Sequence, residues 1–102
     1  MAEFDIYNAK FSWHGCDDVR PWLIIQFRPN NVYGCVPIES ECYGGQCFFI
    51  SDADPDFTAT GLKKSCYVHD ERIYDLPAVS LRAKRGRLKD DLLDRFRKFS
   101  GL

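Results

Sequence analysis

The chain has 102 residues, of which 45% are hydrophobic and 28% are charged, a composition typical of one soluble globular domain. We therefore expect a single domain over residues 1–102. The 14 basic and 15 acidic residues give a net charge of −1, which argues against the strongly basic surface of a typical nucleic-acid binder and against an acidic tail. No apolar run approaches the ~20 residues of a membrane-spanning helix, and the first residues lack the order of a secretory signal, so we expect a cytoplasmic protein without membrane contact.

Short apolar segments in the first two thirds of the chain predict β-strands, because they are rich in aromatic and β-branched residues. The predicted strands are residues 4–11, 22–27, 32–38, 46–51 and 66–69. Between them, Pro29-Asn30-Asn31 and Gly44-Gly45 supply residue types that suit tight hairpin turns, where positive φ is needed. We therefore expect successive antiparallel hairpins.

The last third of the chain changes to a helical pattern after Ser80. Its apolar stripe, at spacings of three to four residues, consists of Leu88, Leu92, Leu93, Phe96 and Phe99. Asp90 and Asp91 near the start of this helix and basic residues near its end complement the helix dipole, and Gly101 is expected to end it. The expected fold class is therefore mainly β, a small antiparallel barrel plus a C-terminal helix.

The cysteines form no recognisable framework. They are Cys16, Cys35, Cys42, Cys47 and Cys66, an odd number with no C-x-x-C spacing. We therefore expect neither a set of disulfides nor a zinc ribbon, and we interpret the cysteines as reduced, small apolar residues. Cys42 and Cys47 flank a four-residue turn, so a metal or redox role for this pair is the alternative.

Two groups of basic residues could follow the phosphates of a nucleic acid. Lys63-Lys64 is the first group, and a window of eight residues without an acid is the second. The window contains Arg82, Lys84, Arg85, Arg87 and Lys89. The alternative is a solvated loop and helix start whose charges serve solubility.

Arg20 stands apart from both groups, between the acidic pair Asp17-Asp18 and an apolar strand. An arginine where a loop enters a core strand can be held rigidly enough to contact a phosphate with both arms of its guanidinium. The alternative is a local ion pair with Asp17 or Asp18.

His14 and His69 are the chain's two candidates for proton transfer near neutral pH. His14 lies in a loop, and His69 follows a predicted strand and precedes Asp70-Glu71. A hydrogen-bonded structural role is the alternative for each. The sequence contains no Gly-rich phosphate loop, no H-E-x-x-H motif and no nucleophile elbow, so we expect no metal or other cofactor.

Six short motifs follow one another over nearly the whole chain. They are Asp5-Ile6-Tyr7-Asn8-Ala9, Val19-Arg20-Pro21-Trp22-Leu23-Ile24-Ile25-Gln26, Val36-Pro37-Ile38-Glu39-Ser40, Gly61-Leu62-Lys63-Lys64-Ser65-Cys66-Tyr67-Val68, Arg72-Ile73-Tyr74-Asp75-Leu76 and Lys84-Arg85-Gly86-Arg87-Leu88. Their order resembles the MazF/PemK (Kid-like) toxins of type II toxin–antitoxin systems, and the Arg-Pro strand is the most specific motif. The resemblance implies an SH3-like barrel with a C-terminal helix, a homodimer, and a metal-independent endoribonuclease that cleaves single-stranded RNA and binds a cognate antitoxin.

The resemblance also implies roles for particular residues. Arg20 matches the family's active-site arginine and would clamp the phosphate. His69 would be the general acid, and Glu71 or Asp70 the carboxylate base. His14 would border the RNA groove. The two basic groups described above supply the other candidate RNA-binding residues, Lys63, Lys64, Arg82, Lys84 and Arg85.

The chain departs from the family pattern at three places. Glu39 stands where the family has a threonine, with Ser40 beside it as the hydroxyl that could replace it, so both are candidates for the catalytic site. Phe4 stands where the first strand opens with glycine, and the first loop lacks the family's Gly-x-Glu-Gln element.

These departures leave an alternative function open. It is a non-enzymatic barrel, either a gyrase poison of CcdB type acting through its last residues or a binding protein with impaired catalysis. Exposed apolar residues would fit the interface of a dimer in either case. The candidates are Trp13, Phe27 and Phe57.

Overall fold

A computed structural model of the protein describes residues 2–12, 18–43 and 45–101. In chain order the elements are β1 (Asp5–Lys10), β2 (Val19–Arg28), β3 (Val32–Glu39), β4 (Phe48–Ile50), α1 (Phe57–Thr60), β5 (Cys66–Val68), β6 (Tyr74–Pro77), the 3-10 turn η1 (Ala78–Ser80), β7 (Leu81–Arg87) and α2 (Asp90–Ser100). None of the helices in these ranges has the length and apolar character needed to cross a membrane.

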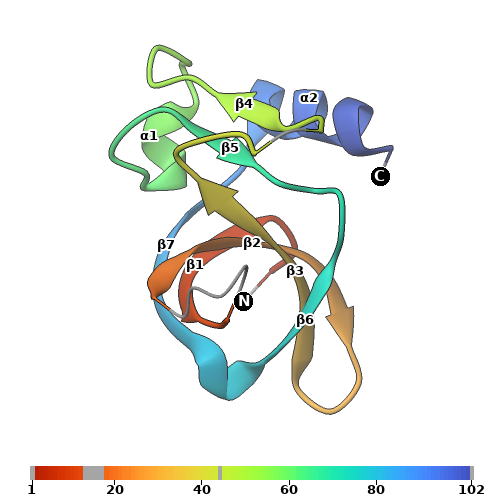
Figure 1. The fold of residues 1–102 in the computed structure, drawn as a ribbon. Helices are drawn as coiled ribbons and strands as arrows, with labels where there is room; N and C mark the ends of the chain where they lie inside the picture. The colour runs from red at the N-terminus through yellow and green to blue at the C-terminus, as the bar shows by residue number, and fades with distance from the viewer. Residues whose placement is uncertain (1, 13–17, 44, 102) are drawn as a thin grey trace.

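The strands form one bent antiparallel sheet with the order β4-β5-β3-β2-β1-β7, and β6 also pairs with β3. Strands β1, β2, β3, β6 and β7 curl into a ring in the lower part of Figure 1, and β4, β5 and both α-helices lie above it. The expected fold class, a mainly β antiparallel barrel with a C-terminal helix, is confirmed.

Strand β3 is the central element because it pairs with three other strands. One edge pairs with β2. The other edge pairs with β6 through residues 32–35 and with β5 through Ile38 and Glu39. The His69 N–H continues the β5 ladder by donating to the Pro37 carbonyl at 3.0 Å. The chain from β5 to β6 therefore follows one edge of β3, with a loop over residues 70–73 projecting between the two strands.

Two hydrophobic clusters cover opposite faces of the central strands. The larger cluster lies against α2 and contains Phe4, Ile6, Leu23, Ile25, Val36, Ile38, Phe48, Ile50, Leu62, Cys66, Val68, Leu88, Leu92 and Phe96. The smaller cluster contains Ala9, Trp22, Ile24, Cys35 and Leu76. Because β2 contributes side chains to both clusters, residues 22–25 are all buried, which explains why this segment is an unbroken apolar run.

Phe4 joins the C-terminal helix to the sheet. Its N–H donates to the Ile24 carbonyl at 2.7 Å, and its own carbonyl accepts from the Leu88 N–H at 2.9 Å. Its ring meets the Phe96 ring edge to face, with centroids 6.3 Å apart, and the Arg97 guanidinium lies 5.0 Å over it. The start of the first strand and the last helix are therefore held together.

Most predicted elements occur in the structure. The five predicted strands correspond to β1 to β5, and the β2–β3 hairpin turns through Asn30 and Asn31 at φ 64° and 57°. The predicted helix is α2, with acidic residues in its first turn, and it ends at Gly101 in the left-handed conformation (φ 79°). The sequence did not predict β6 or the short helix α1.

The helical interpretation of the segment after Ser80 is wrong for residues 81–87, which form β7. The basic window is therefore mostly strand and not a loop and helix start. Strand β7 pairs with β1, where Lys84 lies opposite Tyr7 and Arg87 lies opposite Asp5. This pairing satisfies the second hydrogen-bonding edge of β1, a tertiary requirement that the local pattern of charges does not reveal.

Strand β7 and helix α1 meet backbone to backbone at two glycines. A Cβ on Gly86 would overlap the Ala59 carbonyl oxygen, and a Cβ on Gly61 would overlap the Arg85 carbonyl oxygen. The Arg85 guanidinium closes this contact, since Nη2 and Nε donate to the Gly61 carbonyl at 2.8 and 3.1 Å and Nη1 donates to Asn8 Oδ1 at 3.2 Å. The close approach therefore requires glycine at both positions.

We expect Gly86→Ala to lower the free energy of unfolding by about 3 kcal/mol, because the added methyl group meets backbone atoms that cannot rotate away. Denaturant unfolding followed by circular dichroism measures the change. Gly101→Ala is the matched control: nothing lies within 4 Å of its Cβ position, so the left-handed φ of 79° alone costs about 1 kcal/mol. Equal losses for the two variants would contradict the steric explanation.

Candidate functional site

Arg20 and Glu39 form an ion pair between the start of β2 and the end of β3. The pairing of Trp22 with Pro37, continued by two residues along each strand, brings Arg20 opposite Glu39, so both side chains leave the same face of the sheet. They are 13% and 18% exposed. Of the two local partners considered from the sequence, Asp18 is exposed and Asp17 lies outside the described residues. The pair therefore links the two strands beside the smaller apolar cluster.

The ion pair belongs to a row of residues that crosses the sheet from β4 to β7. In order, the row contains Phe49, Tyr67, Glu39, Arg20, Ala9 and Leu81. Directly opposite residues in antiparallel strands share a face. The Phe49 and Tyr67 rings are in contact, with centroids 5.1 Å apart. An aromatic pair therefore stands next to the charged pair on one surface.

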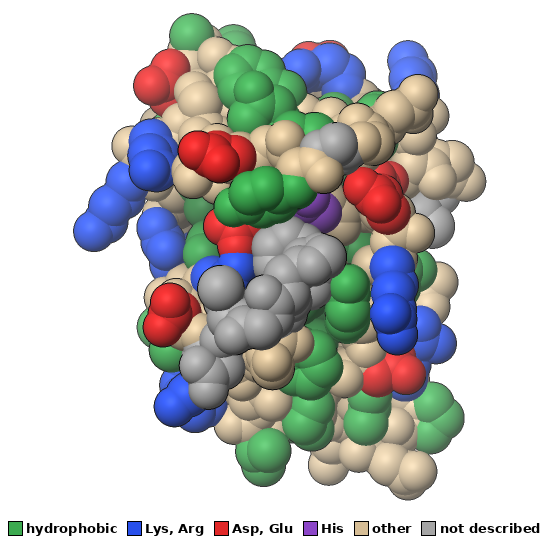
Figure 2. Space-filling view, in the orientation of Figure 1, with side chains coloured by type: hydrophobic (Ala, Val, Ile, Leu, Met, Phe, Trp, Pro, Cys, Tyr) green, Lys and Arg blue, Asp and Glu red, His purple; other side chains and the backbone are tan. Residues whose placement is uncertain are grey.

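His69 lies beside this row. Its position opposite Pro37 makes it a diagonal neighbour of Glu39 on the same face. His69 Nε2 lies 2.7 Å from the Glu41 carbonyl oxygen, and because a carbonyl only accepts, Nε2 carries the proton. Nδ1 lies 3.8 Å from Cys47 Sγ. Figure 2 shows acidic, basic and histidine side chains close together near the middle of this face.

Cys42 and Cys47 are joined by a disulfide, which corrects the interpretation of these two as reduced apolar residues. The turn between them, with Gly45 at φ 66°, brings their Cα atoms to 6.0 Å, within the range that a disulfide spans. Tyr43 in this turn stacks on His69, with ring centroids 5.5 Å apart and planes 32° apart. The described residues of the disulfide loop, 41–43 and 45–47, therefore cover one side of the histidine through Tyr43.

The other predicted catalytic residues lie around this centre. Ser40 is exposed and directly follows β3. Glu71 is exposed, and its carboxylate lies against the disulfide loop, since a Cβ on Gly45 would come within 2.6 Å of Glu71 Oε1. His14 lies outside the described residues. The structure thus brings three candidates, Arg20, Glu39 and His69, to one face and places Glu71 at its border.

The predicted RNA-binding cations do not form one patch. Lys63 and Lys64 are exposed between α1 and β5. Arg82 donates to the Val79 carbonyl at 2.8 Å and is exposed. Arg85 is half-buried in the internal contact with α1 described above. Lys63 and Lys64 are therefore the pair best placed to meet a ligand at the β5 end of the row.

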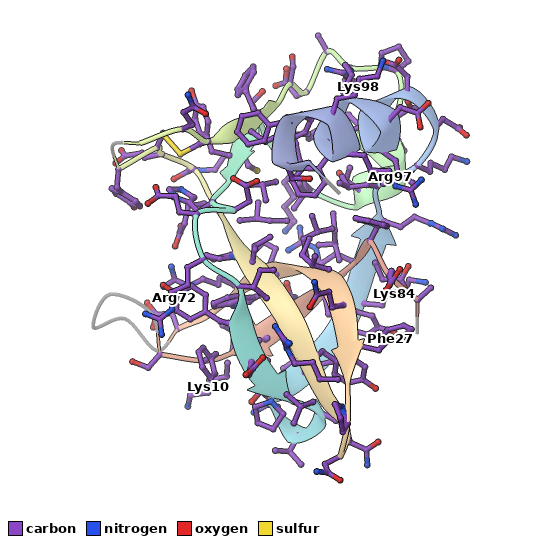
Figure 3. The ribbon with its side chains drawn as sticks, turned by 90° about the vertical axis from the view of Figure 1, so that its right-hand side faces the viewer. Lys10, Phe27, Arg72, Lys84, Arg97 and Lys98 are labelled. Atoms are coloured by element: carbon purple, nitrogen blue, oxygen red, sulfur yellow. A yellow bond between two sulfur atoms is a disulfide. The ribbon has the colours of Figure 1, made fainter. Side chains whose placement is uncertain are left out.

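Two cations on the side of the site were not singled out from the sequence. In Figure 3, Lys10 and Arg72 lie on the same side of the molecule as the disulfide, whereas Lys84 and Arg97 lie on the opposite side. The Arg72 guanidinium is 4.9 Å from the centre of the Tyr74 ring. Lys84 contacts Asp5 at 3.4 Å. Lys84 is thus directed away from the Arg20–Glu39 face.

Burial raises the pKa of both free thiols of the described chain. It raises the pKa of the Cys35 thiol to about 12, with Asp75 adding to the rise, and it raises the pKa of Cys66. Both thiols are buried, as expected for small apolar residues. Cys16 lies outside the described residues.

Within the described ranges, no three His, Cys, Asp or Glu side chains are grouped so that they could hold a metal ion. No protein-family model matches the chain, and a search of curated proteins finds none with significant sequence similarity. The function must therefore be argued from the geometry of the Arg20–Glu39 face.

Three aromatic residues at the site, Tyr43, Phe49 and Tyr67, were not predicted to be functional. The sequence could have indicated Phe49, because it alternates along the strand with Phe48 and Ile50. With those two buried, Phe49 faces outward. The stacking of Tyr43 on His69 depends on the disulfide and could not be predicted from the spacing of residues.

The Asp70 carboxyl gives a test of this region by pH. Burial is the main cause that raises its pKa above the usual 3.8; its backbone hydrogen bond opposes the rise, and the charge of Glu71 adds to it. The unfolded chain therefore releases the Asp70 proton at a lower pH than the folded protein does. The free energy of unfolding falls as the pH rises from 3.8 through the higher pKa of the folded state. We expect Asp70→Asn to raise the unfolding temperature at pH 7 and to lose this advantage below pH 3.8.

The exposed Glu3 provides the control, since Glu3→Gln should leave the unfolding temperature unchanged within error. Calorimetry between pH 3 and 7 makes the comparison. An Asp70→Asn variant that is less stable than the parent at pH 7 would contradict the conclusion that burial of the charged Asp70 carboxylate destabilises the fold.

The disulfide gives a second test. We expect the double variant Cys42→Ser, Cys47→Ser to lower the free energy of unfolding by about 2 kcal/mol, the loop-closure value for so short a loop. Amide exchange over residues 41–47 should become faster because the loop loses its cross-link. Exchange measured by mass spectrometry gives the result, and β1 serves as the internal control. Unchanged exchange over 41–47 would show that the cross-link does not order this loop.

Proposed function

We propose that the chain is a MazF/PemK-like toxin, a metal-independent endoribonuclease that cleaves single-stranded RNA at the Arg20–Glu39 face. The observation that carries this proposal is the ion pair between Arg20 on β2 and Glu39 on the neighbouring strand β3. Cleavage without a metal needs a cation that holds the phosphate and a base that takes a proton. Arg20 and Glu39 supply one group of each kind.

The reaction proceeds by attack of a ribose 2′-hydroxyl on the adjacent phosphate. The base takes the hydroxyl proton, a bond forms between the 2′-oxygen and phosphorus, and the bond from phosphorus to the 5′-oxygen breaks. The products are a 2′,3′-cyclic phosphate and a 5′-hydroxyl, which receives a proton from the general acid. Negative charge on the phosphate oxygens grows during this step, so a fixed guanidinium stabilises the transition state.

Exchange of partners at the Arg20–Glu39 ion pair would free both residues for catalysis when RNA binds. In the protein alone, Glu39 occupies the guanidinium of Arg20. A bound phosphate competes for the same guanidinium, which can contact two of its oxygens at once. Glu39 then loses the cation that favours its charged form, and it accepts the 2′-hydroxyl proton more readily. Substrate binding thus activates the base.

His69, Ser40 and Glu71 complete the proposed site. His69 is the proposed general acid, although it reaches the leaving oxygen only after its ring releases the Glu41 carbonyl. Ser40 adds a hydroxyl beside Glu39, and Glu71 is the alternative base at the border of the face. We also propose a homodimer, a cognate antitoxin as partner and a cytoplasmic location, where mRNA is available.

A second function is favoured by one observation, the neutralisation of Arg20 by Glu39. A barrel in which the carboxylate keeps the arginine would bind a partner without cleaving RNA, as a gyrase poison of CcdB type does. Deleting residues 100–102 separates the two functions, since a poison that acts through its last residues loses toxicity and a ribonuclease keeps it.

We expect Arg20→Ala to reduce cleavage of a single-stranded RNA at least about 100-fold, because it removes the cation at the reacting phosphate. The assay contains EDTA, so that a metal-dependent contaminant does not contribute, and gel analysis of a labelled RNA measures the rate. Arg28→Ala is the matched control. Arg28 lies on the same strand and also forms an ion pair, with Asp75, but at the other end of β2.

Glu39→Gln identifies the base. We expect its cleavage rate to fall about 100-fold and to lose the rise with pH that an ionising carboxylate produces. Equal rates for the parent, Arg20→Ala and Glu39→Gln would exclude this site as the nuclease centre. A parent protein that leaves RNA intact in EDTA would exclude the proposed activity altogether.

A further inference from the structure

Two aromatic ring pairs border the Arg20–Glu39 ion pair on its own face. Phe49 and Tyr67 form the first pair, and Tyr43 and His69 form the second. We propose that these pairs are stacking platforms for two unpaired bases of a single-stranded RNA that has a phosphate held by Arg20. The choice of RNA as ligand rests on the proposed function.

The first platform lies on the outer strand of the sheet. Phe49 is 47% exposed although its neighbours Phe48 and Ile50 are buried, so its ring is not needed to fill the core. Tyr67, directly opposite on β5, holds one side of the ring at a centroid distance of 5.1 Å. An exposed aromatic ring is thus held in place by its neighbour, and a nucleobase can stack on it.

The second platform is held more firmly. Tyr43 is 62% exposed, and the adjacent Cys42 is cross-linked to Cys47. Its ring rests on His69, whose Nε2 is hydrogen-bonded to the Glu41 carbonyl. Because the loop is restrained before any ligand arrives, a base that stacks on Tyr43 orders little additional chain.

Both platforms lie close to the proposed reaction centre. Phe49 is three strands from Arg20 in the same row, about 14 Å at the usual strand spacing of about 4.8 Å, and Tyr67 stands between them next to Glu39. His69 is a diagonal neighbour of Glu39 on this face. A phosphate at Arg20 therefore has two aromatic surfaces beyond Glu39, one on β4 and β5 and the other where Tyr43 packs on His69.

The charges near the platforms favour a short, unpaired strand. Lys63 and Lys64 are exposed just before β5, and Lys10 and Arg72 lie on the side of the molecule that carries the disulfide, as Figure 3 shows. Acidic residues of the same region, Glu41 and Glu71, oppose them. Since the net attraction for phosphates is small, stacking must supply much of the affinity, and the bases of a duplex are not free to stack.

The test measures binding of an RNA that cannot be cut. The probe is a fluorescein-labelled 2′-O-methyl hexauridylate, which lacks the attacking hydroxyl, and fluorescence anisotropy at fixed salt gives its Kd. We expect Phe49→Ala and Tyr43→Ala each to weaken binding about tenfold, within the range measured for loss of one stacked base. Tyr43→Trp should restore binding, because it returns an aromatic surface.

Phe99→Ala is the matched control. Phe99 is 39% exposed and contacts the Phe48 ring at 5.5 Å, so it resembles Phe49 in exposure and pairing, but it lies on α2 and packs on the face of β4 opposite Phe49. We expect its Kd to stay within twofold of the parent. A second probe with the same backbone but without bases should bind the parent weakly and should not distinguish the variants.

Each outcome decides the proposal. Binding by Phe49→Ala and Tyr43→Ala equal to that of the parent, equal affinity of the two probes, or absence of binding would overturn it. Thermal unfolding of each variant verifies that the fold is retained. A parent that cleaves RNA while the platform variants bind normally refutes the platforms alone. A parent that binds through the platforms and does not cleave refutes the ribonuclease activity alone.

Discussion

The change of partner along one edge of β3 is the constraint on which the site depends. The first half of that edge pairs with β6 and the second half with β5, while the opposite edge stays with β2. Strand β3, which pairs with β6 and then with β5, is covered on both faces by the two hydrophobic clusters and carries apolar residues on both. At its end Glu39 forms the ion pair with Arg20. The charged pair therefore lies where the apolar interior stops and the two halves of the molecule join.

The same junction gathers the other polar and aromatic groups. The β5–β6 loop must project where β3 changes partners, and His69 is the last residue before it that still bonds to β3. The disulfide loop rests on this residue through Tyr43 and the Glu41 carbonyl. Residues from four separate parts of the sequence thus meet on one surface, because the sheet leaves them no other common position.

The residues that could be predicted from the sequence are those whose local pattern agrees with their tertiary environment. The apolar run at residues 22–25 and the apolar stripe of α2 are examples. Arg20 stood out because it is a charged residue just before that apolar run. The helical prediction was wrong for residues 81–87 because an edge strand with many cations resembles the start of a helix. Pairing with β1 makes this segment a strand. The partner of Arg20, Glu39, required the β2–β3 register, which no local pattern contains.

The link through Phe4 has a consequence for folding. Its carbonyl bonds to the Leu88 N–H and its ring packs on Phe96, so Phe4 finds these two partners more than 80 positions later in the chain. Contacts of such long sequence separation form slowly, because most of the chain must be present before they close. Until residues 88–96 emerge, the larger apolar cluster lacks its cover, and the partly made chain exposes a surface that invites aggregation or a chaperone.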